Sequence, residues 1–197
     1  MTPRLILAST SRYRAELLGR LGLPFTTAAP DVDESPRPDE APRERALRLA
    51  RAKAGAVASR YPDAWVIGSD QVAHLDGRIL DKPGDSARAR AQLAEQSGRS
   101  VEFHTAVVLH RQTPPGAVEH VDRTVVRFRP LTAIEIARYV EKDKPFDCAG
   151  GFRSEGLGAA LFASMETTDP AALVGLPVIW LAGALRAAGL DPLAPST

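Results

Sequence analysis

The apolar positions of this chain form short runs and alternations that predict the strands of a sheet. The runs Leu5–Ala8 and Ala64–Ile67 have the length of buried strands, and Phe25–Ala28 predicts a shorter strand between them. Ser100–His110 places alternate residues on two faces, and we expect it to pair with Val118–Phe128 across a Pro-Pro-Gly loop. These segments predict the core of a sheet.

Apolar residues spaced three and four apart predict helices between these strands. The longest is Pro42–Ser59, because proline is tolerated in a first turn and an apolar stripe runs along the helix. Ser11 and Thr132 are candidate N-caps. The other expected helices are Arg12–Leu21, Ser86–Gln96, Ala133–Glu141, Asp169–Leu173 and Pro177–Ala187. Charged residues lie near the ends of these predicted strands and helices, and open α/β sheets bind ligands at such ends.

Asp70 lies inside an extended segment, between the apolar run Ala64–Ile67 and the turn Asp76-Gly77. Asp-Gly between apolar flanks is a strong hairpin signal, so Arg78–Leu80 is expected to return antiparallel. A carboxylate at Asp70 is unfavourable to bury unless cations or a metal compensate it. The alternative is a kinked bend whose acid faces water, and this stretch alone does not decide between them.

Several charged residues have both a structural and a functional interpretation. Arg12 and Arg14 lie in the first turn of a helix, where cations are unfavourable unless an anion such as phosphate lies among them. Lys53 falls beside an apolar stripe, where it either extends its amine to water or faces an enclosed phosphate. The acidic run Asp31–Glu34 is either a solvated loop or a set of oxygen ligands for Mg²⁺ or Mn²⁺.

Composition narrows the function classes. The chain has 197 residues, 44% hydrophobic and 25% charged, with a formal net charge of +1, so no global field favours nucleic acid or an anionic membrane. No apolar stretch approaches transmembrane length, and the first residues lack the pattern of a signal peptide. The single cysteine, Cys148, excludes an internal disulfide framework. We expect one domain over residues 1–197 and a cytoplasmic protein.

Familiar catalytic motifs are missing from the sequence. It has no phosphate-binding loop of the G-x-x-x-x-G-K-[ST] type, no dinucleotide fingerprint and no nucleophile elbow. His104 and His110 have no ligand partner close in sequence, so we assign them to a strand surface. The acids Glu34 and Asp70 and the cations Arg14, Lys53 and Lys82 remain, a combination suited to cleaving a phosphoanhydride.

Several segments in this order resemble the Maf family of nucleoside triphosphate pyrophosphatases. The resemblance runs through nearly the whole chain, and its central Ser-Asp-Gln is similar to the subgroup that acts on 7-methyl-GTP. The segments are Leu5–Leu18, Asp31–Glu34, Gly68–Val72, Lys82-Pro83, Cys148–Gly158 and Asp169–Pro177.

The resemblance implies a fold and an activity. It implies an elongated mixed β-sheet flanked by helices, with two lobes, a cleft between them and assembly as a homodimer. The implied reaction is hydrolysis between the α- and β-phosphates of a nucleoside triphosphate, giving a monophosphate and pyrophosphate with a divalent cation, Mg²⁺ or Mn²⁺.

The resemblance also implies roles for individual positions. Asp70 matches the proton acceptor, and Glu34 with Asp70 matches the metal site. Ser9, Arg14, Lys53 and Lys82 match phosphate-binding positions, and Tyr13, Gln71 and Glu155 match positions linked to base selectivity. Two positions depart from the pattern: Arg12 replaces a common proline, and Ala15 replaces a second arginine of the subgroup.

Two hypotheses about function follow. In the first, the protein hydrolyses modified nucleotides and keeps them out of nucleic acid. In the second, it binds nucleotide without turnover and regulates cell division or septum formation, a role linked to Maf relatives. Nucleic-acid binding is disfavoured, because no basic stripe is interleaved with stacking aromatic residues.

Overall fold

The computed structural model describes residues 4–194, which form one seven-stranded sheet with helices on both faces. The strands are β1 (Leu5–Ala8), β2 (Thr26–Thr27), β3 (Trp65–Leu75), β4 (Arg78–Ile79), β5 (Ser100–Arg111), β6 (Gly116–Phe128) and β7 (Phe162–Glu166). The helices are α1 (Arg12–Gly19), α2 (Pro42–Ala58), α3 (Ser86–Gln96), α4 (Ala133–Asp143), α5 (Pro170–Val174) and α6 (Val178–Ala187). None of the helices in residues 4–194 is long and apolar enough to cross a membrane.

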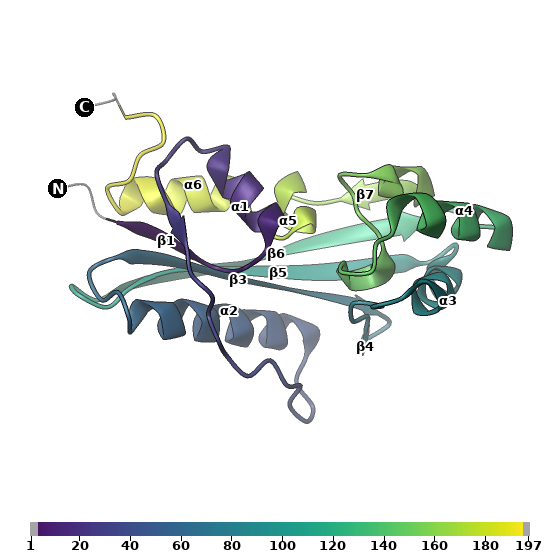
Figure 1. The fold of residues 1–197 in the computed structure, drawn as a ribbon, viewed down its shortest axis with the longest axis horizontal. Helices are drawn as coiled ribbons and strands as arrows, with labels where there is room; N and C mark the ends of the chain where they lie inside the picture. The colour runs from purple at the N-terminus through teal and green to yellow at the C-terminus, as the bar shows by residue number, and fades with distance from the viewer. Residues whose placement is uncertain (1–3, 195–197) are drawn as a thin grey trace.

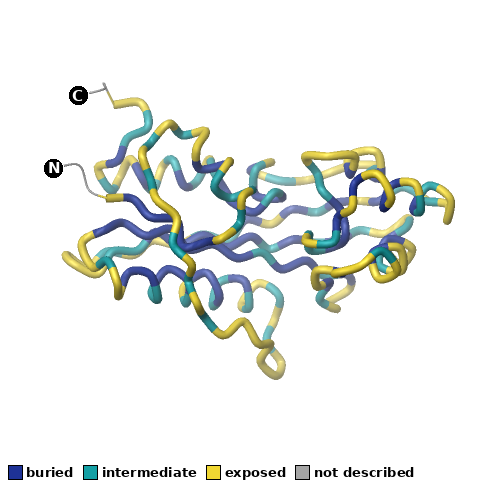
Figure 2. The backbone as a smooth tube through the Cα atoms, viewed as in Figure 1, coloured by how far each residue is buried: buried dark blue, intermediate teal, exposed yellow. Residues whose placement is uncertain are grey.

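The sheet is mixed, and its order is β2-β1-β3-β5-β6-β7 with β4 paired to β3. β1 pairs parallel with β2 and β3, whereas β3, β5, β6 and β7 form an antiparallel series. Figure 2 shows that the long central strands are buried over most of their length. The expected α/β class with an elongated mixed sheet is therefore confirmed.

The helices divide the molecule into two lobes along the sheet (Figure 1). In one lobe α1 and α6 cover one face and α2 covers the other, around two apolar clusters that share the sheet. In the other lobe α3 and α4 surround a third cluster, which includes Leu93, Phe103 and Val140. The long strands β3 and β5 pass through both lobes, so the sheet joins them.

α2 packs unusually close to β3 because small residues face each other across the contact. Ala46, Ala50 and Ala54 are buried on the inner side of the helix. They meet Gly68 of β3, where an added Cβ would clash with the Ala50 carbonyl and lie only 2.7 Å from the Ala54 nitrogen. This close approach fixes the distance between the α2 side chains and the strand.

The expected hairpin is present. Asp76 and Gly77 both have positive φ angles, 49° and 82°, as a type I′ turn requires. β4 then returns antiparallel, with Ile79 opposite His74.

Some expected boundaries are wrong. α1 ends at Gly19 rather than Leu21, and the second strand contains only Thr26–Thr27. α4 continues to Asp143, where Lys144 ends it in the left-handed conformation. β7 was not expected, because its mostly exposed residues Phe162–Glu166 carry no buried alternation. The glycine-rich stretch after α4 forms two short 3-10 helices, Ala149–Gly151 and Leu157–Leu161.

Candidate functional site

The fold leaves one stretch of β3 open along an edge. β1 ends opposite Gly68, and β4 pairs with β3 only at His74 and Leu75. Among the described strands, the stretch between Ser69 and Val72 pairs only with β5. Asp70 lies in the middle of this stretch, so the interruption in the sheet, rather than the end of β3, forms the site.

A cleft of about 900 Å³ opens beside this stretch, and it gathers most of the expected site residues. Its lining includes Ser9, Tyr13, Arg14, Glu34, Lys53, Asp70, Gln71 and Lys82. The ninth expected residue, Glu155, lines an adjoining pocket of about 120 Å³, to which Tyr13, Gln71 and Lys82 also contribute. The structure therefore brings together residues that lie far apart in sequence.

Lys53 joins the two acids of the cleft. Its Nζ donates to Asp70 Oδ1 at 2.6 Å and lies 2.8 Å from Glu34 Oε1. The side chains of Lys53 and Asp70 are only 7% and 8% exposed, whereas Glu34 is 56% exposed. Burial raises the pKa of the Asp70 carboxyl, and the nearby charges of Lys53 and Arg14 oppose the rise. The buried-acid interpretation of Asp70 is confirmed, because cations do compensate it.

Contacts from both ends of the chain fix Arg14. It lies in the first turn of α1, whose N-cap Ser11 accepts a hydrogen bond from the Arg14 backbone nitrogen. The Arg14 Nε donates to the Gly175 carbonyl at 2.9 Å, and the buried Ser69 hydroxyl lies 2.9 Å from the same oxygen. The turn after α5 thus orients Arg14 toward the cleft.

The remaining phosphate-site candidates line different walls of the cleft. Ser9 follows β1 and is 6% exposed, and its hydroxyl accepts a hydrogen bond from the Ser11 backbone nitrogen at 3.1 Å. Lys82 is exposed on the loop after β4, which belongs to the other lobe. A ligand that contacts both residues would span the cleft.

The three residues expected to select the base differ in how firmly hydrogen bonds and packing hold their side chains. The amide nitrogen of Gln71 donates to Thr105 Oγ1 and to the Ala172 and Leu173 carbonyls, at 2.9, 2.9 and 3.0 Å. Gln71 therefore holds α5 against the sheet as well as lining the cleft. Tyr13 is partly buried and Glu155 is exposed.

The two departures from the family pattern have different surroundings. Arg12 lines the cleft, where its guanidinium lies 4.8 Å from the centre of the Tyr13 ring and donates to the Tyr13 hydroxyl at 2.8 Å. Ala15 packs instead against the apolar cluster between α1 and α6. Arg12 thus adds a cation to the cleft, whereas Ala15 faces the core.

Sequence reasoning missed Arg45. This residue lines the cleft from α2, and its side chain is 15% exposed. Its Nε is buried and has no hydrogen-bond partner within residues 4–194. Arg45, Leu49 and Lys53 are spaced four apart on one face of α2 and all line the cleft, so helical spacing from Lys53 could have identified Arg45.

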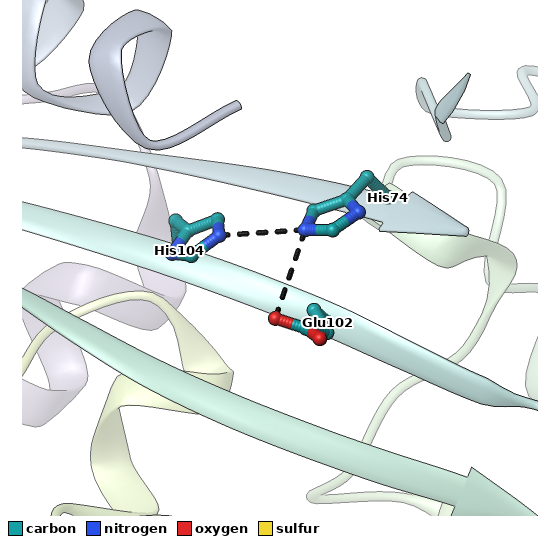
Figure 3. A group of neighbouring side chains, drawn as sticks. All are labelled: His74, Glu102 and His104. Atoms are coloured by element: carbon teal, nitrogen blue, oxygen red, sulfur yellow. Dashed lines mark hydrogen bonds and ion pairs between the residues drawn. The ribbon is translucent and has the colours of Figure 1, made fainter. Parts of the chain in front are cut away.

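Histidines also gather outside the cleft, and His104 lies on a strand, as expected. His74, Glu102 and His104 lie together on the face of the sheet that α2 covers farther along (Figure 3). His104 has no ligand partner nearby in sequence, but strand pairing places His74 of β3 beside it. No local pattern in the sequence gives this register. His110 is not part of this group.

The fold and the cleft define an α/β protein that gathers acids and cations, with Asp70 and Lys53 buried among them, at an interruption in a mixed sheet. The model of the Maf-like protein family matches residues 4–188, and the chain belongs to this family.

Curated relatives extend this result. The chain is 57% identical to the 7-methyl-GTP pyrophosphatase of Xanthomonas axonopodis pv. citri, over 96% of this chain and 98% of the relative. It is 53% identical to the 7-methyl-GTP pyrophosphatase of Bordetella avium, over 97% and 96%. A solved structure of the Staphylococcus aureus Ham1 protein aligns with a TM-score of 0.47 and 14% identity, covering 79% of this chain and 89% of that one.

Proposed function

We propose that this protein is a nucleoside triphosphate pyrophosphatase that hydrolyses 7-methyl-GTP to 7-methyl-GMP and pyrophosphate. Family membership and the names of the relatives support this proposal. The observation that carries the proposal is that acids and cations converge in one cleft: Asp70, Glu34, Lys53 and Arg14. Hydrolysis of a phosphoanhydride needs a group that accepts the proton of water and cations that stabilise the leaving pyrophosphate.

Asp70 is the proposed proton acceptor. Water attacks the α-phosphorus, its proton passes to the Asp70 carboxylate, and the bond from the α-phosphorus to the bridging oxygen breaks. Pyrophosphate leaves with that oxygen. The raised pKa of Asp70 favours this role, because a carboxylate with a higher pKa is a stronger base.

The cations bind the phosphates in this proposal. Arg14 and Lys53 neutralise the charge that grows on the leaving pyrophosphate, while Ser9 donates a hydrogen bond from its hydroxyl. Lys82 reaches the same phosphates from the other lobe. Because Arg14 is held by the Gly175 carbonyl, it needs little reorganisation on binding.

The donor set fits a divalent metal ion. Glu34 and Asp70 bring carboxylate oxygens to within 2.8 Å and 2.6 Å of Lys53 Nζ, and such oxygens are the ligands that Mg²⁺ and Mn²⁺ prefer. Glu34 and Asp70 would hold the ion. When bound, it would polarise the phosphate oxygens and lower the pKa of a coordinated water. Lys53 holds the two carboxylates together, and its amine would move from between them to the phosphates when the ion binds.

Base selectivity is assigned to the smaller pocket. Glu155 can accept from the N–H donors on the Watson–Crick edge of guanine. Tyr13 offers an aromatic face to the positive charge of a 7-methylated ring, as cations favour such faces. Gln71 lines the boundary between the two pockets and orients α5.

Purified protein with Mg²⁺ or Mn²⁺ and a panel of 7-methyl-GTP, GTP, dTTP and UTP tests this proposal. We expect pyrophosphate and monophosphate as first products, the highest kcat/KM for 7-methyl-GTP, and a loss of activity of about 10²-fold or more in Asp70→Asn. Asp63→Asn, at an exposed site outside the cleft, is the matched control.

Two outcomes contradict the proposal. Orthophosphate as the first product would mean that a different bond is cleaved. Tight nucleotide binding without turnover would favour the alternative, a nucleotide-binding regulator of cell division.

We also propose, from the family resemblance, that the protein is cytoplasmic and works as a homodimer. Light scattering tests the assembly, because one chain has a mass of 21.1 kDa and a dimer twice that mass. A mass of one chain at micromolar concentration contradicts the dimer, and cell fractionation tests the location.

A further inference from the structure

We infer that His74, Glu102 and His104 form a binding site for one zinc-class transition-metal ion, separate from the cleft around Asp70. The three side chains offer two imidazole nitrogens and one carboxylate oxygen, all within 4.8 Å of one another (Figure 3). Three protein ligands leave a fourth position for water in a tetrahedral zinc site.

The distances fit a tetrahedral ion. Zinc–nitrogen bonds of about 2.0–2.1 Å place two tetrahedral ligand atoms roughly 3.3 Å apart. The Nε2 atoms of His74 and His104 are 3.3 Å apart. The His74 Nε2 lies 3.9 Å from Glu102 Oε2, and the ligand atoms of His104 and Glu102 lie within 4.8 Å of each other, so the carboxylate must move closer to both rings to complete the site.

Rigid strands hold the three residues. His74 of β3 is directly opposite Glu102 of β5, and His104 is opposite Val72, so all three lie on one face of the sheet. β3 and β5 form the long central pair of the sheet. Side chains of His74 and Glu102 are 14% and 32% exposed, which allows an ion to enter from solvent. Binding of an ion therefore requires little further ordering of the three side chains.

The hydrogen bonds define the change that an ion would bring. Gly77 donates its backbone N–H to His74 Nδ1 at 3.3 Å, which puts the His74 proton on Nε2, toward His104 Nε2. His104 then carries its proton on Nδ1, which is buried without a hydrogen-bond partner in residues 4–194. The ion would replace the histidine–histidine hydrogen bond and move the His74 proton to Nδ1, so the Gly77 N–H would lose its acceptor. No net proton is released.

The surrounding charges orient the carboxylate. Arg123 Nε donates to Glu102 Oε2 at 2.7 Å, a contact of the kind that commonly orients a ligating carboxylate. Arg43 and Arg123 add positive charge near the group. This charge opposes the binding of any cation, so the site depends on the strong coordination bonds that imidazole forms with transition metals.

Ligand chemistry separates this site from the cleft. Imidazole nitrogens suit Zn²⁺, Co²⁺ and Ni²⁺, whereas the oxygens of Glu34 and Asp70 suit Mg²⁺ and Mn²⁺. His74 lies four residues beyond Asp70 on the same strand, roughly 13 Å away at the rise of a β-strand. Saturating Mg²⁺ should therefore leave the histidine site free.

Titration of the full-length protein with Co²⁺ in excess Mg²⁺ tests the inference. We expect one equivalent of Co²⁺ to give the intense visible absorption of a tetrahedral complex, and Zn²⁺ to abolish it by competition. His74→Gln and His104→Gln should each weaken binding at least tenfold. His110→Gln, on the same strand outside the group, should leave it unchanged.

Three results would overturn the inference: no saturable Co²⁺ signal, a signal that survives both histidine variants, or a signal lost in Asp70→Asn. Circular dichroism checks the fold of each variant. If a histidine variant fails to fold, Glu102→Gln provides the same test, because it keeps the size of the side chain while removing the charged ligand. Unchanged Co²⁺ affinity in folded Glu102→Gln would then contradict the proposed ligand set.

Discussion

Lys53 determines the charge state of the cleft, because its amine lies within 2.8 Å of both acids. Burial alone would favour the neutral form of Asp70, and the ammonium group opposes that effect. A buried acid without its cation would exchange a proton at higher pH. The pair therefore adjusts the basicity of Asp70, in addition to any contact with phosphate.

The pH dependence of kcat/KM follows from this arrangement. Asp70 accepts a proton only when ionised, so activity should fall as the pH drops through its pKa, which is raised above the ordinary value of about 3.9. Lys53→Met removes a charge that lowers this pKa, so the acidic limb should move to higher pH. A pH–rate profile of both proteins measures the shift. An unmoved limb would mean that another group controls it.

A second prediction at the scale of single residues concerns Arg45. The Arg45 Nε has no hydrogen-bond partner in residues 4–194, and its Nη2 forms only a 3.9 Å ion pair with Asp81. If the guanidinium binds a phosphate, Arg45→Gln should raise KM about tenfold or more, since hydrogen bonds to charged groups contribute about 1.5–3 kcal/mol. The kcat should change less. Arg51→Gln is the control, because Arg51 lies on the same helix, is 57% exposed and pairs with Glu119. Equal KM values for the two variants would exclude the role.

At the scale of elements, the contact between α2 and β3 positions Lys53 against Asp70. Gly68→Ala would force a Cβ into the Ala50 carbonyl and the Ala54 nitrogen. We expect a lower free energy of unfolding, by about 1–3 kcal/mol as for other overpacked sites, and a reduced kcat as Lys53 moves. Urea denaturation and steady-state kinetics measure these effects.

Gly55→Ala is the matched control for this prediction. Gly55 lies in α2 with nothing within 4 Å of an added Cβ, so alanine should stabilise the helix by up to about 1 kcal/mol. If Gly68→Ala were as stable as Gly55→Ala, the close approach would not constrain the helix.

Elements with a clear pattern could be predicted, and those defined by their neighbours could not. Ser86–Gln96 matches α3 residue for residue, because its N-cap Asp85 and its apolar spacing are local signals. β7 is an edge strand with exposed residues, so its pairing with β6 depends on register rather than on composition. The Asp76-Gly77 turn was predictable because its backbone conformation demands those residues.

At the scale of the molecule, the site could be predicted only in part. The resemblance supplied the positions of Asp70 and Lys82, and the fold brought both to one cleft. No local pattern indicates that β1 stops opposite Gly68, which is what opens the edge beside Asp70. The group around His104 likewise depends on the pairing of β3 with β5, a contact between residues about thirty positions apart.

The two lobes also predict how the molecule responds to nucleotide. Lys82 lies in one lobe and Ser9 in the other, so a bound triphosphate would connect them across the cleft. We expect a non-hydrolysable α,β-methylene analogue of 7-methyl-GTP with Mg²⁺ to slow hydrogen exchange in the loops on both sides, residues 28–41 and 81–85. At a hundred times its dissociation constant it should stabilise the fold by about 2.7 kcal/mol.

Lys82→Ala separates the contributions of the two lobes. Its exposed side chain leaves the core unchanged, so the variant should keep its melting temperature without nucleotide. With the analogue bound, protection from hydrogen exchange should persist at residues 28–41, which include Glu34 and contact Lys53. Protection should weaken at residues 81–85. Protection confined to one loop in the unmodified protein would contradict binding across the cleft. Equal protection in Lys82→Ala and in the unmodified protein would mean that Lys82 does not bind the nucleotide. A phosphate bound from both lobes must lose one contact when the Lys82 amine is deleted.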